Sequence, residues 1–395
     1  MQYNFKLFFK NWRQSFFQAK GTHARLTRKR LGFLILFYIV WPVWGCIVWF
    51  SFLLDNVFFP KFKHRPVEKP LFIIGNFRSG STYLQRLIAR DKTNFASART
   101  WDIFISPSII QTKIFSVLVK IDSLFGSPVR RMFKRFDSKT LGQVDIHKIS
   151  FFEPEEDENF LLHIWSSFFG GVLFPFLDEF LPYIYFDNQV PDGEKRRIMG
   201  FYRKTVQRFM YSRTSRHYLS KNPSFSPKIA SLRETFPDAR IVYLARNPLE
   251  MLPSTISWFG YIWRVFSDPL EQYPFIPEII SFTKHWYAYT LKVLDESNDD
   301  DHLIIKYNDL ISDPKATIEL IYKKFGYEMS AEFRAELESS SEQAGNFRSM
   351  HTYSLEKMGV SREAVLETYK DVFERFGFDM DIDGESEPQD DSVLS

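Results

Sequence analysis

The stretch 71–90 limits the possible folds of this chain more than any other part of it. It reads LFIIGNFRSGSTYLQRLIAR. The apolar run 71–74 predicts a buried strand, and the periodicity of 82–90 predicts a helix with one apolar face. The loop between them is rich in small residues. Such a strand, loop and helix start form a cradle for phosphate or sulfate, because unpaired backbone N–H groups at the helix N-terminus point at the anion.

The loop differs from a nucleotide P-loop at one position. A P-loop reads Gly, four residues, Gly, Lys and then Ser or Thr. Gly75 and Gly80 have this spacing and Thr82 holds the hydroxyl position, but Ser81 stands where the lysine belongs, and the cation of the loop is Arg78. Because NTP hydrolysis uses that lysine on the β- and γ-phosphates, the loop favours a different phosphate-like group. The alternative is a glycine-containing turn that packs a helix on a strand.

A second stretch, 236–259, carries another group of anion ligands. It reads FPDARIVYLARNPLEMLPSTISWF, in which 241–245 predicts a buried strand that ends at Arg246. Asn-Pro then breaks the strand and the following residues suit a new helix. An arginine provides a bidentate charged clamp and Ser254 a hydroxyl donor, so the two side chains suit one phosphate.

Together the two stretches resemble the sulfotransferases that use 3′-phosphoadenosine 5′-phosphosulfate (PAPS), and the resemblance covers roughly residues 68–378. LSKNPSFSPKIASLRETFPDA at 219–239 resembles the segment that leads into the second strand. HLIIKYNDLISDPKATIELIYKKFGY at 302–327 resembles the late strand, Asp-Pro turn and helix, and HTYSLEKMGVS at 351–361 resembles the loop before the last helix. The resemblance implies the P-loop nucleoside-triphosphate-hydrolase-like sulfotransferase fold.

The same resemblance implies roles for individual residues. Cytosolic members of the family carry a lysine where this chain has Arg78, and the arginine resembles the membrane-associated and bacterial branches. PAPS is the implied co-substrate, 3′,5′-ADP the product, and no metal is required. The implied ligands of the 5′-phosphosulfate are Arg78, Ser79, Gly80, Ser81 and Thr82, and those of the 3′-phosphate are Arg246 and Ser254.

An acceptor hydroxyl also needs a base, and the candidates lie in DIHKISFFEPEEDENFLLH, residues 145–163. His147 follows the first loop at a distance comparable to the catalytic histidine of cytosolic sulfotransferases, and Glu155 belongs to an acidic run that resembles a family patch. Both are reasonable bases. The alternatives are a structural histidine and a solvated helix N-terminus. Lys221 either reaches the transferring sulfuryl group or is a solvated lysine at a strand end.

Composition narrows the remaining possibilities. The net charge of +3 is too small to indicate nucleic-acid binding. Cys46 is the single cysteine, so an intrachain disulfide is impossible. No cluster of Cys and His has metal-ligand spacing, and 43 phenylalanines fit a large core together with a membrane-contacting surface.

Residues 31–54 form an uncharged apolar segment, which as a helix would be about 36 Å long and long enough to span a bilayer. Basic residues crowd 1–30, where no acid occurs, which favours a cytoplasmic N-terminus and a single span. Pro42 near the middle instead suggests a shallow hairpin. Basic residues on both flanks and the missing disulfide favour a monotopic enzyme on the cytoplasmic face.

Buried strands near 71–74, 241–245 and 303–306 alternate with predicted helices at 82–90, 315–325 and 361–376, and the last helix carries one apolar stripe. We therefore expect an α/β fold, a parallel sheet flanked by helices, with an N-terminal hydrophobic membrane segment. The expected function is a membrane-associated sulfotransferase that moves sulfate from PAPS to a hydroxyl or amine of a lipid or glycan. A P-loop small-molecule kinase and a non-catalytic membrane scaffold are the alternatives. The expected parts are a basic segment 1–30, a membrane segment 31–59, a sulfotransferase domain 68–378 and an acidic disordered tail 379–395.

Overall fold

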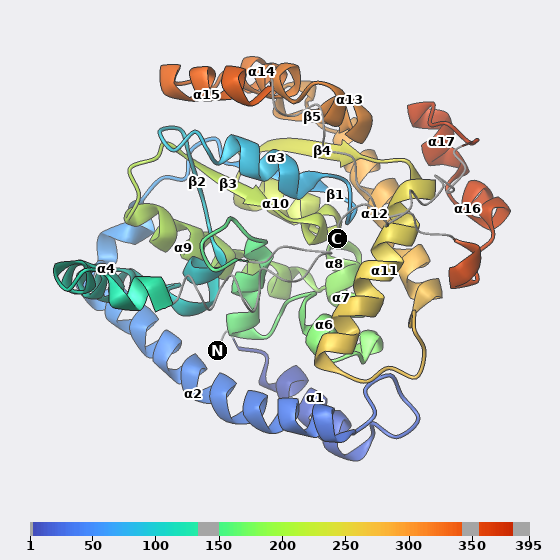
Figure 1. Cartoon of the computed structure of the whole chain (residues 1–395), viewed down its shortest axis with the longest axis horizontal. Coiled ribbons are helices and arrows are strands. Elements are labelled where there is room, and N and C mark those ends of the chain that lie inside the picture. Colours follow the sequence, from blue (N-terminus) through green and yellow to red (C-terminus); the bar gives the residue numbers. More distant parts are fainter. Residues whose placement is uncertain (1–2, 133–149, 342–354, 382–395) are drawn as a thin grey trace, which may run out of the picture.

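The computed structural model describes residues 3–132, 150–341 and 355–381. Its centre is a sheet of five parallel strands in the order β2-β3-β1-β4-β5 (Figure 1). This confirms the expected α/β class and the parallel sheet. The strands are β1 Leu71–Gly75, β2 Phe95–Ser97, β3 His217–Lys221, β4 Arg240–Ala245 and β5 His302–Lys306.

Helices cover both faces of the sheet, because successive strand residues point to opposite sides. Leu71 and Ile73 pack on one side with apolar residues of α3 and α14, whereas Phe72 and Ile74 belong to the larger core on the other side. In Figure 1, α14 and α15 lie above the sheet, and α9, α6, α7 and α8 lie below it. The helices around the sheet are α3 Ser81–Ile88, α9 Asp192–Tyr211, α10 Ile229–Thr235, α11 Pro248–Phe266, α12 Ile276–Asp295, α13 Tyr307–Ser312, α14 Pro314–Phe325 and α15 Ala331–Ser341, with the short helices α6 Gly170–Leu173, α7 Leu181–Ile184 and α8 Phe186–Gln189.

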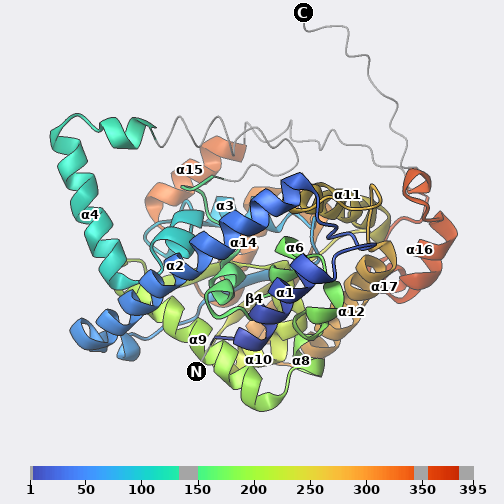
Figure 2. The same cartoon turned by 90° about the horizontal axis from the view of Figure 1, so that it is seen from below.

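The N-terminal helices form a layer of their own. α1 spans Phe5–Phe17, α2 spans Arg28–Phe58 and α4 spans Ile109–Leu124. Seen from below, α2 crosses the face of the body, α1 lies beside it, and α4 extends to one side (Figure 2). Pro42 lies inside α2, which is one continuous helix. The suggested break into a hairpin is therefore wrong, because contacts with the body hold both halves of the helix in line.

The C-terminal apolar stripe belongs to two helices rather than one. α16 spans Arg362–Thr368 and α17 spans Lys370–Phe376, with Tyr369 between them. The hydroxyl of Tyr369 bonds Thr283 Oγ1 over 2.7 Å in the core. The stripe is buried as expected, but the predicted single helix 361–376 is wrong, because the chain bends at Tyr369 to keep both pieces on the body.

Candidate active site

The loop between β1 and α3 is fixed by glycines at both ends. Gly75 has φ +143°, and a Cβ there would lie 2.5 Å from the carbonyl oxygen of Leu244 on the neighbouring strand. Gly80 has φ +82° and caps α3 in the left-handed region, where a Cβ would lie 2.8 Å from the ring of Tyr307. Both positions therefore require glycine. The loop is held rigidly where the strand ends and where the helix begins.

The first turn of α3 has the backbone arrangement that the predicted anion cradle requires. The N–H groups of Ser81 and Thr82 precede the first intrahelical donor, because the N–H of Leu84 is the one that bonds back to Gly80. Ser79 is buried and its hydroxyl donates to the carbonyl of Asn76 over 2.8 Å, which closes the loop on itself. Backbone N–H groups are thus aimed out of the loop, as an anion site needs.

Arg78 lies at the tip of this loop in a strained conformation. Its backbone φ is +63°, which is unfavourable for residues other than glycine. Its Nε donates to Ser254 Oγ, on α11, over 2.9 Å. The two residues assigned to opposite ends of a nucleotide are therefore in direct contact.

Arg246 follows β4 and closes the other side of the loop. Its Nη1 donates to the carbonyl of Arg78 over 2.6 Å, and its Nε pairs with Glu250 over 3.0 Å. Its guanidinium lies 4.1 Å above the ring of Tyr307, a cation–π contact. Arg246 is half-buried, and a phosphate that displaced the Glu250 carboxylate would reach its guanidinium. The sequence did not single out Tyr307 and Glu250; the signal for the tyrosine is its place directly after β5.

The register of the sheet sets the order of these groups. β1 lies between β3 and β4, with Ile73 opposite Lys221 and Gly75 opposite Leu244. Lys221 therefore lies beside one flank of the loop and Arg246 beside the other, each about 5 Å away because neighbouring strands have that spacing. All of these groups lie at the carboxyl ends of the strands, where open α/β sheets bind ligands.

The acidic run lies at the same edge. The N–H of Glu155 donates to the carbonyl of Ala98 over 3.0 Å, directly after β2, and its carboxylate accepts the N–H of Glu156 over 3.0 Å. The bond to Ala98 places Glu155 next to the end of β2, which β3 separates from β1. Glu155 is half-buried. Of the two proposed bases it is the one that the structure describes, and His147 lies outside the described residues.

Lys221 is buried and paired with a glutamate that the sequence reading did not select. Its ammonium lies 2.7 Å from Glu156, and both side chains are almost completely enclosed. Burial raises the pKa of the Glu156 carboxyl, and the charge of Lys221 opposes that rise. The ion pair lies beside the loop and is shielded from water. Electrostatic interactions are stronger in such a low-dielectric environment than in water.

The next two acids of the run are structural. Asp157 is enclosed by the hydroxyls of Tyr202, Tyr218 and Ser220, and burial raises the pKa of its carboxyl. Glu158 pairs with Lys228 over 3.0 Å in the core. The interpretation of the run as a solvated helix N-terminus is therefore wrong, because distant lysines and tyrosines satisfy its charges. Trp263 and Trp286 are buried in the core.

Within the described ranges no group of three or more His, Cys, Asp and Glu side chains is placed to hold a metal ion. The described part of the chain contains one helix, α2, whose length and composition would allow it to cross a membrane. By themselves these two properties also suit a core helix or a signal sequence.

Comparisons with known proteins agree with this geometry. Residues 183–331 match the model of the sulfotransferase family. The omega-hydroxy-beta-dihydromenaquinone-9 sulfotransferases Stf3 of Mycobacterium bovis and Mycobacterium tuberculosis are 23% identical over 327 residues, covering 79% of this chain and 76% of theirs.

Solved structures of sulfotransferases share the fold. The sulfotransferase STF9 from Mycobacterium avium has a TM-score of 0.68 at 17% identity, covering 96% of this chain and 98% of its own. STF1 from Mycobacterium tuberculosis has a TM-score of 0.63 at 17% identity, covering 93% and 98%. The family match, these relatives and the shared fold together support membership of the sulfotransferase family, whose members are enzymes.

Proposed function

We propose that this enzyme transfers the sulfuryl group of PAPS to a hydroxyl, or an amine, of a membrane lipid. The observation that carries the donor assignment is the direct link between the two anion sites. Arg78 bonds Ser254, and Arg246 bonds the carbonyl of Arg78, so cations from β1 and β4 meet at one loop. Arg78 and Arg246 are two separate cations at this loop, and a ligand with two anionic groups, such as a 3′-phosphorylated nucleotide, can pair with both.

The residues present fit this co-substrate. Arg78 and the N–H groups of Ser79 to Thr82 would hold the 5′-phosphosulfate, and Arg246 with Ser254 would hold the 3′-phosphate. When bound, PAPS supplies an activated sulfuryl group. The protein's part is to fix the position of that group and to stabilise the charge that develops near Arg78, as in phosphoryl transfer.

Two further groups act on the acceptor side. Glu155 would take the proton from the acceptor hydroxyl, because its half-buried carboxylate lies at the same strand edge as the loop. Lys221, held by Glu156, would add positive charge beside the loop while staying shielded from water. His147 remains the alternative base.

A lipid is the acceptor that the surroundings favour. The relatives named above are sulfotransferases of omega-hydroxy-beta-dihydromenaquinone-9, a menaquinone lipid that carries a hydroxyl. In this chain, the outer face of α2 is apolar and exposed over most of its length. Association with a membrane would bring lipid acceptors to the enzyme without release into water.

A transfer assay tests this function. Purified enzyme receives radiolabelled PAPS and a membrane lipid extract, and label is counted in the organic phase. We expect label in lipid that disappears in Arg246→Ala. Label that stays entirely aqueous, with transfer to a soluble phenol or sugar instead, would contradict the lipid acceptor.

Once an acceptor is known, the variants Glu155→Gln and His147→Ala identify the general base. If one variant loses turnover but keeps its affinity for 3′,5′-ADP, the residue that was replaced in it is the base. If both variants keep full activity, neither residue is the base.

A further inference from the structure

α2 is bound to the body of the protein along its whole length. At its start, Arg30 donates to the carbonyls of Leu173 and Phe266. At its middle, the indole N–H of Trp44 donates to the carbonyl of Phe104 over 2.8 Å. Farther along, the indole N–H of Trp49 donates to the carbonyl of His163 over 3.0 Å. The helix is thus part of the folded body and not a stalk that extends from it.

The end of α2 is tied by charge. Asp55 accepts the N–H groups of Ile109 and Ile110 over 3.0 and 2.9 Å, at the N-terminus of α4, and pairs with Arg208 over 3.2 Å. Arg208 lies over the rings of Phe52 and Phe62. Breaking this buried ion pair to release the helix would cost several kcal/mol.

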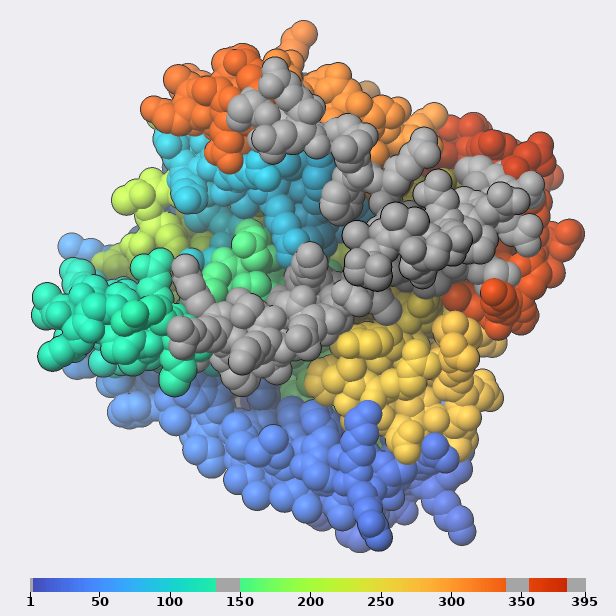
Figure 3. All heavy atoms as spheres, viewed as in Figure 1, coloured from blue at the N-terminus to red at the C-terminus, as the bar shows by residue number. Residues whose placement is uncertain are grey.

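The opposite face of α2 is apolar and open to solvent. Ten of its side chains are between 45 and 64% exposed, which far exceeds the scattered apolar residues of an ordinary soluble surface. The helix lies along the lower edge of the molecule, where its residues form a continuous rim (Figure 3). These side chains are Ile35, Leu36, Ile39, Val40, Val43, Ile47, Phe50, Leu53, Val57 and Phe58.

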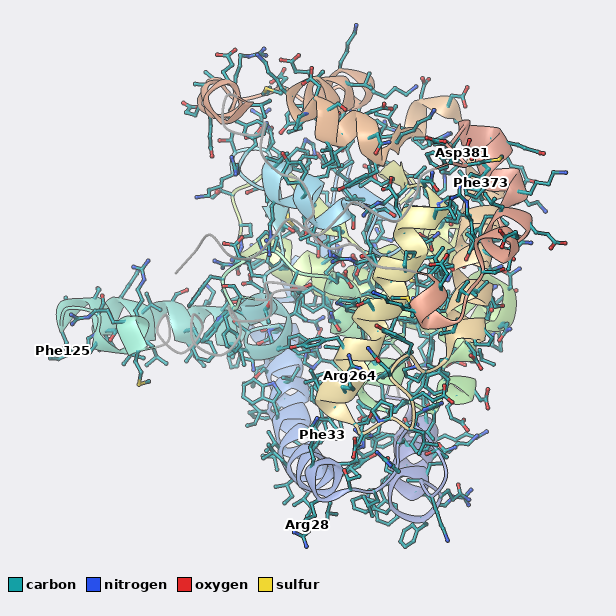
Figure 4. All side chains as sticks on the ribbon, turned by 45° about the vertical axis from the view of Figure 1, so that its right-hand side comes forward. Arg28, Phe33, Phe125, Arg264, Phe373 and Asp381 are labelled. Atoms are coloured by element: carbon teal, nitrogen blue, oxygen red, sulfur yellow. The ribbon has the colours of Figure 1, made fainter. Side chains whose placement is uncertain are left out.

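Two other helices extend this surface. α4 leaves the body at the end of α2 and projects outward, with Phe125 at its tip (Figure 4). Between 46 and 81% of the side chains of Ile114, Val117, Leu118, Val119, Ile121 and Leu124 is exposed. α1 adds Phe5, Phe9, Trp12 and Phe17 beside α2 (Figure 2). We call the exposed apolar residues of α1, α2 and α4 the apolar platform.

Basic side chains border the platform. Residues 1–30 contain eight lysines and arginines and no acid, and all of them except Arg30 are exposed. On α4, Lys113 and Lys120 are also exposed. A broad apolar surface with a basic border is typical of a helix that lies in the interface of an anionic bilayer. A soluble protein partner would need no such charge excess.

The contacts of α2 exclude a perpendicular crossing. A helix that spans the bilayer must face lipid or other membrane-embedded protein on every side, whereas one side of α2 packs on the folded body. Crossing the hydrocarbon core would carry the segments around Phe104 and His163, whose carbonyls bind Trp44 and Trp49 in the middle of α2, into lipid at high cost. An orientation parallel to the surface exposes only the platform to lipid.

We propose that α2 lies in the plane of an anionic lipid bilayer, with the apolar platform in the interface and the catalytic body in water. This deepens the membrane association proposed above by fixing its geometry. α11 then sets the height of the site. Its last residues contact α2, and Ser254 lies twelve residues earlier, about 18 Å along the helix. The anion sites therefore stand in water above the lipid headgroups.

Spin labels on one face of α2 test the orientation. Cys46, the single cysteine, is exposed in the middle of the platform. Ile35 and Val57 lie eleven residues to either side on the same face, about 16 Å away in each direction. Cys46 is labelled in the wild type, and Ile35→Cys and Val57→Cys are labelled in a Cys46→Ser background. Full-length protein is bound to vesicles of phosphatidylcholine with phosphatidylglycerol, and label depth is measured from collisions with oxygen and with a water-soluble nickel complex.

We expect all three labels at similar shallow depths, about 5–10 Å below the headgroups. Position 46 near the bilayer centre, with 35 and 57 near opposite interfaces, would overturn the proposal in favour of a span. Three labels that stay water-exposed would overturn it as well.

Vesicle binding gives a second test with a matched control. Leu36→Glu places a charge on the platform, and Leu320→Glu places one on α14, at the far side of the molecule (Figure 1), where the side chain is 49% exposed. Leu36→Glu should reduce binding at least tenfold and Leu320→Glu should leave it unchanged, and added salt should weaken binding of the wild type. Equal binding by all three proteins would contradict the proposal. Binding of 3′,5′-ADP to each variant checks the fold and the donor site, so failure of the membrane geometry and failure of the proposed function are distinguishable.

Discussion

The side chain of Arg78 donates a hydrogen bond from Nε to Ser254 Oγ over 2.9 Å. These residues lie 176 positions apart, on the loop after β1 and on α11. Arg246 adds a bond to the carbonyl of Arg78 over 2.6 Å. The loop after β1, the strand end of β4 and α11 are therefore linked directly by hydrogen bonds.

Removal of the Arg78 side chain should weaken donor binding. Hydrogen bonds to charged groups contribute about 1.5–3 kcal/mol, so Arg78→Ala should lower the affinity for 3′,5′-ADP about 10- to 100-fold. Arg78→Gly should lower it equally but be more stable than Arg78→Ala by about 1 kcal/mol, because φ is +63°. Calorimetric titration and urea unfolding measure the two effects. Wild-type affinity in the glycine variant would show that the side chain is not a ligand.

Glu250 pairs with Arg246 over 3.0 Å and would compete with the proposed 3′-phosphate for it. Because the pair is only partly buried, its disruption should cost little stability, and Glu250→Gln should bind 3′,5′-ADP about two- to fivefold more tightly than the wild type. Glu319→Gln, an exposed residue of α14, is the control and should leave affinity unchanged. Weaker binding by Glu250→Gln would mean that the carboxylate instead orients Arg246 for the ligand.

Gly80 should not tolerate a methyl group. Gly80→Ala combines left-handed strain with a Cβ 2.8 Å from the ring of Tyr307, which together should lower the free energy of unfolding by about 2–5 kcal/mol. Gly126→Ala shares the strain, at φ +77°, but its Cβ would lie 3.9 Å from the nearest atom, so it should cost only about 1–2 kcal/mol. Urea unfolding compares them. An equal loss of stability in both variants would show that the ring of Tyr307 moves aside for the added methyl group.

The buried pair beside the loop should make stability depend on pH once it is broken. Lys221→Met leaves Glu156 without its counter-charge and should cost about 3–5 kcal/mol near neutral pH. Since burial raises the pKa of Glu156 above its unfolded value, the neutral carboxyl is favoured in the fold. The Lys221→Met variant is therefore most stable below the pKa that Glu156 has in the unfolded chain, and it loses stability as the pH rises through the higher pKa of Glu156 in the folded protein.

Urea unfolding of Lys221→Met at pH 5 and pH 8 measures this difference. The double variant Lys221→Met/Glu156→Gln is the control and should recover stability at pH 8, with little difference between the two conditions. A single variant that is equally stable at both pH values would show that water reaches the carboxylate.

The sequence predicts local elements well where the pattern is short-range. Strands at 71–74, 241–245 and 303–306 and the helix after Asn247 are confirmed, because each is a buried run or a capped start that neighbouring residues determine. β2 was missed because it contains only three residues. The break at Tyr369 was missed because the apolar stripe continues across it, and the hydroxyl of Tyr369 is held by distant partners, Thr283 and the carbonyl of Ile280.

Groups that depend on distant partners were harder to predict. The positions of Arg78 in its loop and of Arg246 at its strand end follow from sequence motifs. Their direct contact depends on the fold, which places the two strands side by side. The burial of Glu156 was not predictable, because its partner Lys221 lies 65 positions away. Likewise α2 extends beyond its uncharged stretch, since Asp55 is satisfied by α4 and Arg208.

Calorimetric titration of the full-length protein with 3′,5′-ADP, and separately with ATP and magnesium, tests the central claim most directly. We expect micromolar binding of 3′,5′-ADP that is lost in Arg246→Ala and retained in Leu320→Glu, and no comparable binding of ATP. Tight binding of ATP without binding of 3′,5′-ADP would contradict the assignment of the loop and Arg246 to a PAPS site.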